Sequence, residues 1–144
     1  MRQRLSRRTC RGFSLVEMMI VVGLIGLLAT ISAPPMYRYI QSNRLATNTD
    51  RMVADLQYAR AVSIANGQVI RVDSNTAGYR VVNPSSGQVL RQQNFDDGLA
   101  LAAIQQVRFF PWGMADAAVY NITGPVGAKQ LNLLPTGIVE VACP

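Results

Sequence analysis

Histidine is absent from this sequence of 144 residues. Its absence excludes His-based catalytic triads, His general bases and His metal ligands together. The other polar residues do not replace it, because no paired carboxylates, activated serine or phosphate-binding loop is present. Asp73, Asp96 and Asp97 carry the oxygen ligands that calcium prefers, but they lack the spacing of a calcium loop and are better explained as turn residues. We therefore expect no enzyme, no cofactor and no metal site.

Acidic residues are scarce, with 8 against 14 basic residues, so the formal charge is +6. Such a balance can indicate nucleic acid or an anionic membrane as a partner. The excess is local, however, because five arginines lie in the first twelve residues. Beyond residue 12 the basic and acidic side chains nearly cancel. The basicity therefore belongs to an N-terminal targeting segment and says little about partners.

Cysteine is equally scarce, with Cys10 near the start of the chain and Cys143 next to its end. Removal of a targeting segment that ends at Gly12 would leave Cys143 alone, without a partner for an intramolecular disulfide. In an oxidising compartment such a thiol is either free or pairs between chains.

A long apolar run follows the arginines. Residues 18–33 carry no charge, and with Phe13 to Glu17 they make a helix of about 31 Å, enough to span a bilayer. The arginine-rich side should stay cytoplasmic and the rest of the chain should face outward. Glu17 is the one ionisable residue here, and a carboxylate next to lipid marks a functional site. A cleaved secretory signal peptide is the alternative, but Pro34 makes the small residues before it a poor cleavage site.

Two adjacent prolines, Pro34 and Pro35, should kink the helix, since each removes a backbone N–H and its ring clashes with the preceding turn. Helical periodicity then resumes at Met36 and stops at Asn66-Gly67. Apolar residues at three-to-four spacing in this half predict one face packed on a folded domain; they are Leu45, Met52, Val53, Leu56 and Ala59.

After Gly67 the pattern alternates with a period of two, which predicts strands. The expected strands cover residues 68–73, 78–82, 89–95, 107–112, 118–122, 130–134 and 138–142. Pro135-Thr136-Gly137 should form the turn between the last two strands. The predicted fold class is α+β: a long N-terminal helix, with a transmembrane first half, packed on an antiparallel β-sheet head. The predicted segments are the targeting leader at 1–12, the transmembrane part of the helix at 13–35, its amphipathic part at 36–66 and the β-sheet head at 67–144.

The sequence Gly12-Phe13-Ser14-Leu15-Val16-Glu17 resembles the class III signal of type IV pilins and type II secretion pseudopilins. That resemblance implies that a prepilin peptidase cuts between Gly12 and Phe13 and methylates the new amine of Phe13. It also implies that the apolar helix forms the core of a filament. Inside such a bundle Glu17 needs a cationic partner. The Phe13 amine of a neighbouring subunit is the nearest candidate, and this pairing would set the register of assembly.

Three further segments resemble the GspH/FimT branch of minor pilins and minor pseudopilins. They are the helix end Leu56–Ala65, with its Ala59-Arg60 pair, the strand Val107–Gly113 and the turn Leu134–Gly137. DNA-binding members of this branch carry Gly-Arg-x-Arg after that turn, whereas this chain has Gly137-Ile138-Val139-Glu140. Because arginines that neutralise phosphates supply most non-specific DNA affinity, this end should bind DNA poorly. Arg71, Arg80 and Arg91 lie on separate strands and are better explained as solvated residues.

These observations favour a minor pseudopilin of a type II secretion system or a minor pilin of a type IV pilus, a structural subunit that assembles through its N-terminal helix. The alternatives are a DNA-binding minor pilin for DNA uptake and an uncleaved single-span membrane protein. The implied partners are a prepilin peptidase, other pilins or pseudopilins, an inner-membrane assembly platform and membrane lipid, with nucleic acid disfavoured. The implied location is the inner membrane, single-pass with a periplasmic head, and the pilus or pseudopilus after assembly.

Overall fold

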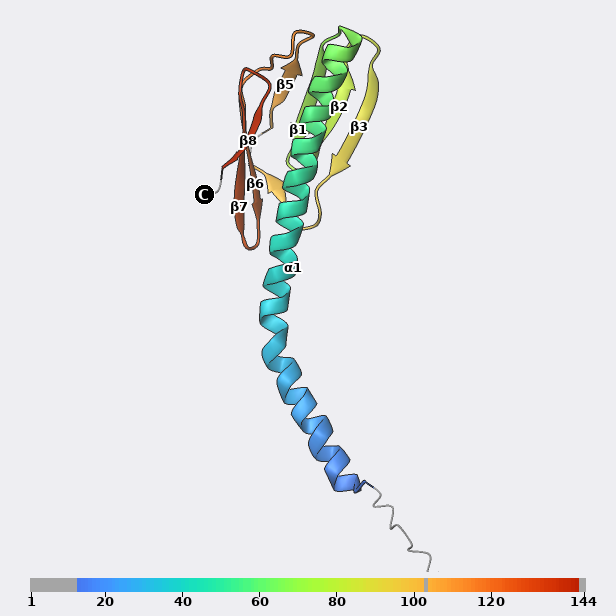
Figure 1. Cartoon of the computed structure of the whole chain (residues 1–144), viewed down its shortest axis with the longest axis vertical. Helices are drawn as coiled ribbons and strands as arrows, with labels where there is room; N and C mark the ends of the chain where they lie inside the picture. Colours follow the sequence, from blue (N-terminus) through green and yellow to red (C-terminus); the bar gives the residue numbers. More distant parts are fainter. Residues whose placement is uncertain (1–12, 103, 143–144) are drawn as a thin grey trace, which may run out of the picture. The chain divides into compact units, whose positions relative to one another are not determined.

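The computed structural model describes residues 13–102 and 104–142, and for residues 31–34 it describes the backbone only (Figure 1). Gly12 and Cys143 lie outside the described residues. The chain divides into two compact units between Tyr37 and Arg38, and each is described by itself.

Helix α1, Leu15–Asn66, crosses both units and has well-formed ends. At its start, the Oγ atom of Ser14 accepts a hydrogen bond from the backbone N–H of Val16 at 3.3 Å, as an N-cap does. At its end, Gly67 has a φ of +62°. The N–H groups of Gly67 and Gln68 donate to the carbonyls of Ile64 and Ser63, which is the Schellman arrangement. The predicted stop at Asn66-Gly67 is confirmed. Pro34 and Pro35 lie within the helical range, and the kink there stays a prediction.

The apolar stripe predicted on the second half of α1 packs into the core of the head. Leu45, Met52, Leu56 and Ala59 are all less than 7% exposed, and Val53 packs against them half-buried. Burying each large side chain contributes roughly 1.5–3 kcal/mol. This face therefore attaches the helix to the β-strands.

The strands form two antiparallel sheets rather than the single sheet that the sequence suggested. The first contains β1 (Ile70–Asn75), β2 (Gly78–Asn83), β3 (Gln88–Asn94) and β5 (Gln106–Phe109), in the order β3-β2-β1-β5. The second contains β4 (Ala100–Leu101), β6 (Ala118–Gly124), β7 (Gly127–Leu133) and β8 (Val139–Ala142), in the order β4-β6-β7-β8. Both sheets lie beside the C-terminal half of α1 (Figure 1). One hydrophobic core joins α1 to both, with Phe109 and Tyr120 among its largest buried side chains.

The structure adds one strand and shifts the ends of several others; β7, for example, begins at Gly127 rather than at Gln130. Strand β4 was not predicted, because two residues are too short to show a period. Strand β5 ends at Phe109 rather than at Trp112. Pro111 has no N–H to continue the ladder, and the chain instead turns. The N–H of Gly113 donates to the Phe110 carbonyl at 2.9 Å, and Gly113 has a φ of +84°.

Candidate assembly segment and head junction

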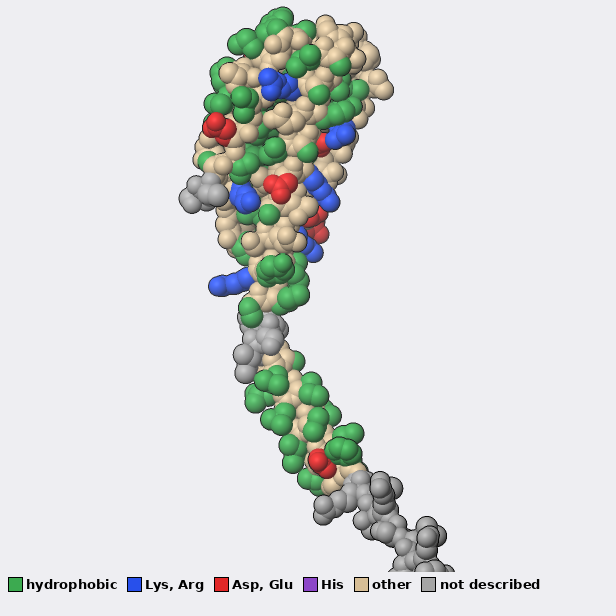
Figure 2. All heavy atoms as spheres, viewed as in Figure 1, with side chains coloured by type: hydrophobic (Ala, Val, Ile, Leu, Met, Phe, Trp, Pro, Cys, Tyr) green, Lys and Arg blue, Asp and Glu red, His purple; other side chains and the backbone are tan. Residues whose placement is uncertain are grey.

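The segment from Phe13 to Thr30 is exposed at every described residue, although most of its side chains are apolar. Figure 2 shows hydrophobic side chains along this part of the helix. A helix that is apolar on all sides is normally buried in lipid or among other helices. In the described part of the chain no single helix meets a length and hydropathy test for a membrane span, but Leu15–Thr30 and Pro35–Asn66 meet it as a pair.

Glu17 lies in the first turn of α1, three residues after the N-cap Ser14. A carboxylate is favourable there because the N-terminal end of a helix carries partial positive charge. The Ser-x-x-Glu spacing is also that of a capping box, a local reason for Glu17 that the sequence reasoning missed. Within residues 13–102 and 104–142 the Glu17 carboxylate makes no ion pair. Phe13, just before the helix, is 75% exposed.

In the head, the three segments that resemble the GspH/FimT branch meet at one junction. Arg60, at the end of α1, donates from Nε to the carbonyl oxygen of Gly113 at 3.0 Å. Ser63, one turn later, has its Oγ atom 2.8 Å from the carbonyl oxygen of Arg60 and 3.2 Å from that of Phe110, so its one proton is shared between the two. Gly137 completes the junction, because a Cβ atom at this position would lie 2.5 Å from the Gly113 oxygen.

The same junction ties the two sheets together. The N–H of Ala115, just after the Phe110–Gly113 turn, donates to the carbonyl of Pro135 at 3.0 Å. The N–H of Gly137 donates to the Leu134 carbonyl at 2.8 Å, which closes the predicted Pro-Thr-Gly turn between β7 and β8. The helix end, the turn after β5 and the β7–β8 turn therefore hold one another through backbone carbonyls.

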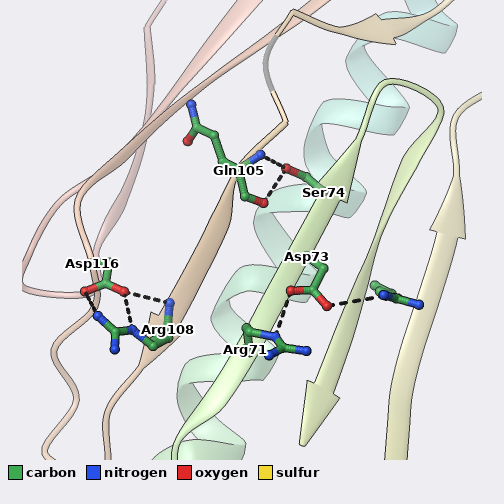
Figure 3. A network of polar contacts seen from close by, with 7 residues as sticks. Arg71, Asp73, Ser74, Gln105, Arg108 and Asp116 are labelled. Carbon is green, nitrogen blue, oxygen red and sulfur yellow. Dashed lines mark hydrogen bonds and ion pairs between the residues drawn. The ribbon is translucent and has the colours of Figure 1, made fainter. Parts of the chain in front are cut away.

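The arginines weighed for nucleic acid are paired within the head. Arg71, on β1 with Asp73 (Figure 3), and Arg80, on β2, both pair with the Asp73 carboxylate, at Nε to oxygen distances of 2.8 and 3.4 Å. Arg108, on β5, pairs with Asp116, in the connection between β5 and β6, at 2.9 Å (Figure 3). Hydrogen bonds from Arg108 hold the pKa of Asp116 below its usual value. Internal pairing leaves less positive charge for phosphates, which agrees with the expectation of poor DNA binding.

Arg91, on the edge strand β3, pairs with Asp55 on α1. Its guanidinium also lies 3.9 Å from the centre of the Tyr58 ring, in cation–π geometry. On the other side of Asp55, the Tyr79 hydroxyl donates to Oδ2 at 2.8 Å. Burial and this bond raise the pKa of Tyr79 well above its usual value. The network holds the exposed edge strand against the helix.

Among the described residues, no group of three or more Cys, Asp and Glu side chains is close enough together to hold a metal ion.

Comparison with known proteins agrees with this arrangement. Residues 48–137 match the family described as type II transport protein GspH, and residues 7–33 match the prokaryotic N-terminal methylation motif. The chain belongs to the GspH family. The GspH match covers the helix end and both sheets as far as Gly137, so it includes the whole junction.

Individual relatives come from both pili and secretion systems. A type IV major fimbrial protein FimA of Dichelobacter nodosus is 34% identical over 125 residues, which cover 83% of this chain and 63% of that relative. A type II secretion system protein H of Xanthomonas campestris pv. campestris is 38% identical over 61 residues, covering 42% of this chain and 36% of that protein. The chain thus spans less than two thirds of the length of the relatives it matches.

A solved structure supports the fold. The type IV minor pilin FimU of Pseudomonas aeruginosa superposes with a TM-score of 0.61, covering 73% of this chain and 92% of that one, at 18% identity. The α+β pilin fold is therefore confirmed. The family match and the pilin relatives agree with the expectation of a structural pilin or pseudopilin subunit. The match to the N-terminal methylation motif lies on the segment that the sequence predicts to be processed.

Proposed function

We propose that this chain is a minor subunit of a pilus-like filament, either the pseudopilus of a type II secretion system or a type IV pilus. A prepilin peptidase cuts between Gly12 and Phe13, and the new amine of Phe13 is methylated. Before assembly the subunit sits in the inner membrane through residues 13–35, with its head in the periplasm. An inner-membrane assembly platform then adds it to other pilins or pseudopilins.

The observation that carries the proposal is the carboxylate of Glu17 on a helix that is apolar on all sides. The segment from Phe13 to Thr30 is exposed throughout, so its natural surroundings are lipid or other helices. Glu17 makes no ion pair within the described residues. A charge in apolar surroundings is costly unless it is paired. The positive amine of Phe13 in a neighbouring subunit supplies that partner.

The proposed pairing also gives assembly a register. Phe13 lies four residues before Glu17, so the two groups sit at the same end of the helix. If the amine and the carboxylate of one chain paired with each other, that pair would not fix the position of one subunit against another. Between chains, the Glu17 of one subunit selects the axial position at which it meets the Phe13 amine of the next. The methylation keeps the positive charge of the amine while processing removes the arginines before it.

Two substitutions of Glu17 separate the pairing role from a capping role. Glu17→Gln keeps a side chain that suits the third position of a capping box, but it removes the charge. Glu17→Ala removes both. If Glu17 acts as the charge partner, both variants should be processed normally and both should be lost from filaments. The amount in sheared filaments is compared with the amount in membranes by immunoblot, and mass spectrometry of the N-terminus reports processing.

Glu140→Ala is the matched control, because it removes an exposed carboxylate from the head. It should enter filaments as the unaltered chain does. Normal incorporation of Glu17→Gln would contradict the charge pairing and leave only the capping role. A membrane-bound protein that still begins at Met1 in cells with an active prepilin peptidase would refute the filament role itself.

A further inference from the structure

Arg38 is the first charged residue after the apolar segment of the helix. Residues 18–37 carry no charged side chain, and Glu17 comes directly before them. At about 1.5 Å per residue this stretch is roughly 30 Å long, which matches the thickness of the hydrocarbon core of a bilayer. With residues 13–35 in the membrane, as proposed above, the level of Arg38 is the headgroup layer on the outward side.

The head has a second element at the same level. The turn between β6 and β7 lies beside α1, at the end of the head away from the C-terminal end of the helix (Figure 1). Arg38 and Ser42, one turn apart on α1, line a depression of about 470 Å³ together with Pro125 and Val126 of that turn. A bilayer surface that meets Arg38 therefore also meets the base of the head.

Large apolar side chains are exposed at this base. Tyr39 is 68% exposed, Ile40 40% and Val126 39%. Further along α1, over residues 41–66, Ile64 is the one exposed side chain of this kind. Tyrosine is enriched where a bilayer meets water, because its ring is apolar and its hydroxyl is polar. We call these three residues, with Arg38 and Ser42, the collar.

The polar groups of the collar have unused donors. Arg38 is exposed and makes no ion pair or side-chain hydrogen bond with the described residues, whereas Arg91 and Arg108 are both paired to carboxylates. The Ser42 hydroxyl is exposed and equally unpaired within the described part of the chain. A guanidinium binds phosphate oxygens through two parallel N–H donors, and a hydroxyl adds a third. The pair therefore suits a phosphate group.

The lining of the depression suits a phospholipid better than a free anion. It holds one cation, one hydroxyl and two apolar side chains, and no carboxylate of a described residue. A phospholipid brings a phosphate together with apolar chains, whereas a free phosphate would leave Pro125 and Val126 against water. The amine of a zwitterionic headgroup also has an acceptor nearby. The loop of Asp97 passes this turn, since a Cβ atom at Gly98 would lie 3.4 Å from the Pro125 ring.

We propose, on the basis of the membrane location proposed above, that the collar docks the head on the phospholipid headgroups of the outward leaflet before assembly. Arg38 pairs with a lipid phosphate, and Ser42 donates to the same group. The exposed apolar side chains of the collar enter the region between headgroups and acyl chains, as those of interfacial helices do. A docked head has a fixed height and tilt, and moving the subunit into a filament must break these contacts.

The test is NMR on the full chain in nanodiscs of phosphatidylcholine and phosphatidylethanolamine that hold one chain each. Two nitroxide-labelled lipids are compared, one labelled at the headgroup and one near the end of an acyl chain. The acyl label should broaden the signals of residues 18–30, which reports insertion of the helix. The headgroup label should broaden the signals of Ser42 and Val126. It should leave the indole signal of Trp112 sharp, because Gly113 beside it packs against Ile64 at the far end of α1.

Two variants test the contacts themselves. Arg38→Gln should lose most of the headgroup-label broadening at Val126, while the acyl-label broadening of residues 18–30 stays unchanged. Val126→Asp, which places a carboxylate against the phosphates, should reduce the broadening at Ser42. Arg51→Gln is the matched control and should behave as the unaltered chain, because Arg51 is exposed on the same helix about 20 Å beyond Arg38.

The two labels separate failure of docking from failure of the membrane location. An inserted helix with no headgroup-label broadening at Val126, or with equal broadening at Val126 and Trp112, would overturn the docking and leave the proposed function standing. Unchanged broadening in Arg38→Gln would overturn it as well. Docking that appears only in discs with two chains would assign the collar to a second copy instead. An acyl label that does not reach residues 18–30 would refute the membrane location, and the docking with it.

Discussion

The Nε atom of Arg60 donates a hydrogen bond to the carbonyl oxygen of Gly113 at 3.0 Å, joining the last turns of α1 to the turn after β5. The donor is charged and partly buried. Its acceptor belongs to a turn that also meets Gly137. One side chain thus connects the helix to the point where the two sheets approach each other.

Replacing Arg60 should therefore destabilise the head. Arg60→Met keeps the apolar stem but removes the donor, and we expect a loss of roughly 1.5–3 kcal/mol in the free energy of unfolding, as for other bonds to charged groups. Urea unfolding of the full chain in micelles, followed by circular dichroism, measures it. Arg44→Met is the control, since Arg44 is exposed on the same helix and should change little. Equal effects of the two variants would contradict the role of Arg60.

Gly137 tests the close approach at the junction separately from backbone strain. Gly137 and Gly87 have almost the same φ, +74° and +70°. A Cβ at Gly137 would lie 2.5 Å from the Gly113 oxygen and 2.9 Å from Arg60 Nε, whereas nothing lies within 4 Å at Gly87. Gly87→Ala should therefore cost only the left-handed penalty, roughly 1–2 kcal/mol.

Gly137→Ala should cost that penalty and an overpacking term of roughly 1–3 kcal/mol more. Urea unfolding of both variants measures the difference directly, because their backbone terms cancel. A difference near zero would mean that the junction opens without cost, and the three segments would then not hold one another as described.

Much of the head could be predicted from local patterns. The stripe from Leu45 to Ala59 identified the buried face of the helix because three-to-four spacing reports one face directly. The Asn66-Gly67 stop and the Pro135–Gly137 turn depend on glycine and proline geometry, which is also local. Strand β4 was missed because two residues are too short to show a period, and the end of β5 was missed because the alternating pattern continues past Phe109 although Pro111 cannot continue the ladder.

The division into two sheets and the polar networks could not be predicted, because they depend on residues far apart in the sequence. Asp55 and Arg91 are 36 positions apart, yet they form an ion pair. Arg60 stood out in the sequence only through the Ala59-Arg60 pair, whereas its contact is with Gly113, 53 positions away. Glu17 was identified from its chemistry alone, because a carboxylate beside an apolar run is costly whether the helix lies in lipid or among other helices.

Tyr79 should make the head less stable at alkaline pH. Burial and the bond to Asp55 raise its pKa, so the folded chain keeps this proton above pH 10, where the unfolded chain loses it. The stabilisation is therefore complete below about pH 10 and falls as the pH rises further. Urea unfolding at pH 9, 10 and 11 should give a smaller decline for Tyr79→Phe than for the unaltered chain.

Ionisation of Tyr120 should also destabilise the folded state at alkaline pH, because burial raises its pKa as well. The stability of a Tyr79→Phe, Tyr120→Phe double variant should therefore decline least as the pH rises. Tyr39→Phe serves as the control, since Tyr39 is 68% exposed. An alkaline decline that is identical in all four proteins would show that these two hydroxyls do not control it.

The Asp116–Arg108 pair should make the stability of the head depend on pH in the acidic range. The hydrogen bonds from Arg108 lower the pKa of Asp116, so the pair stabilises the folded state above the unfolded pKa of about 4. That contribution is lost as the pH falls through the lower folded pKa. The pair is solvent-exposed, with Arg108 at 58% and Asp116 at 34% side-chain exposure, so solvent screening should keep its contribution small. Asp116→Asn should therefore unfold slightly more easily than the unaltered chain at pH 7, and the difference should shrink as the pH falls below about 4 toward the lower folded pKa. A difference that does not shrink with falling pH would assign the effect to the backbone N–H of Arg108, which also donates to Asp116, rather than to charge.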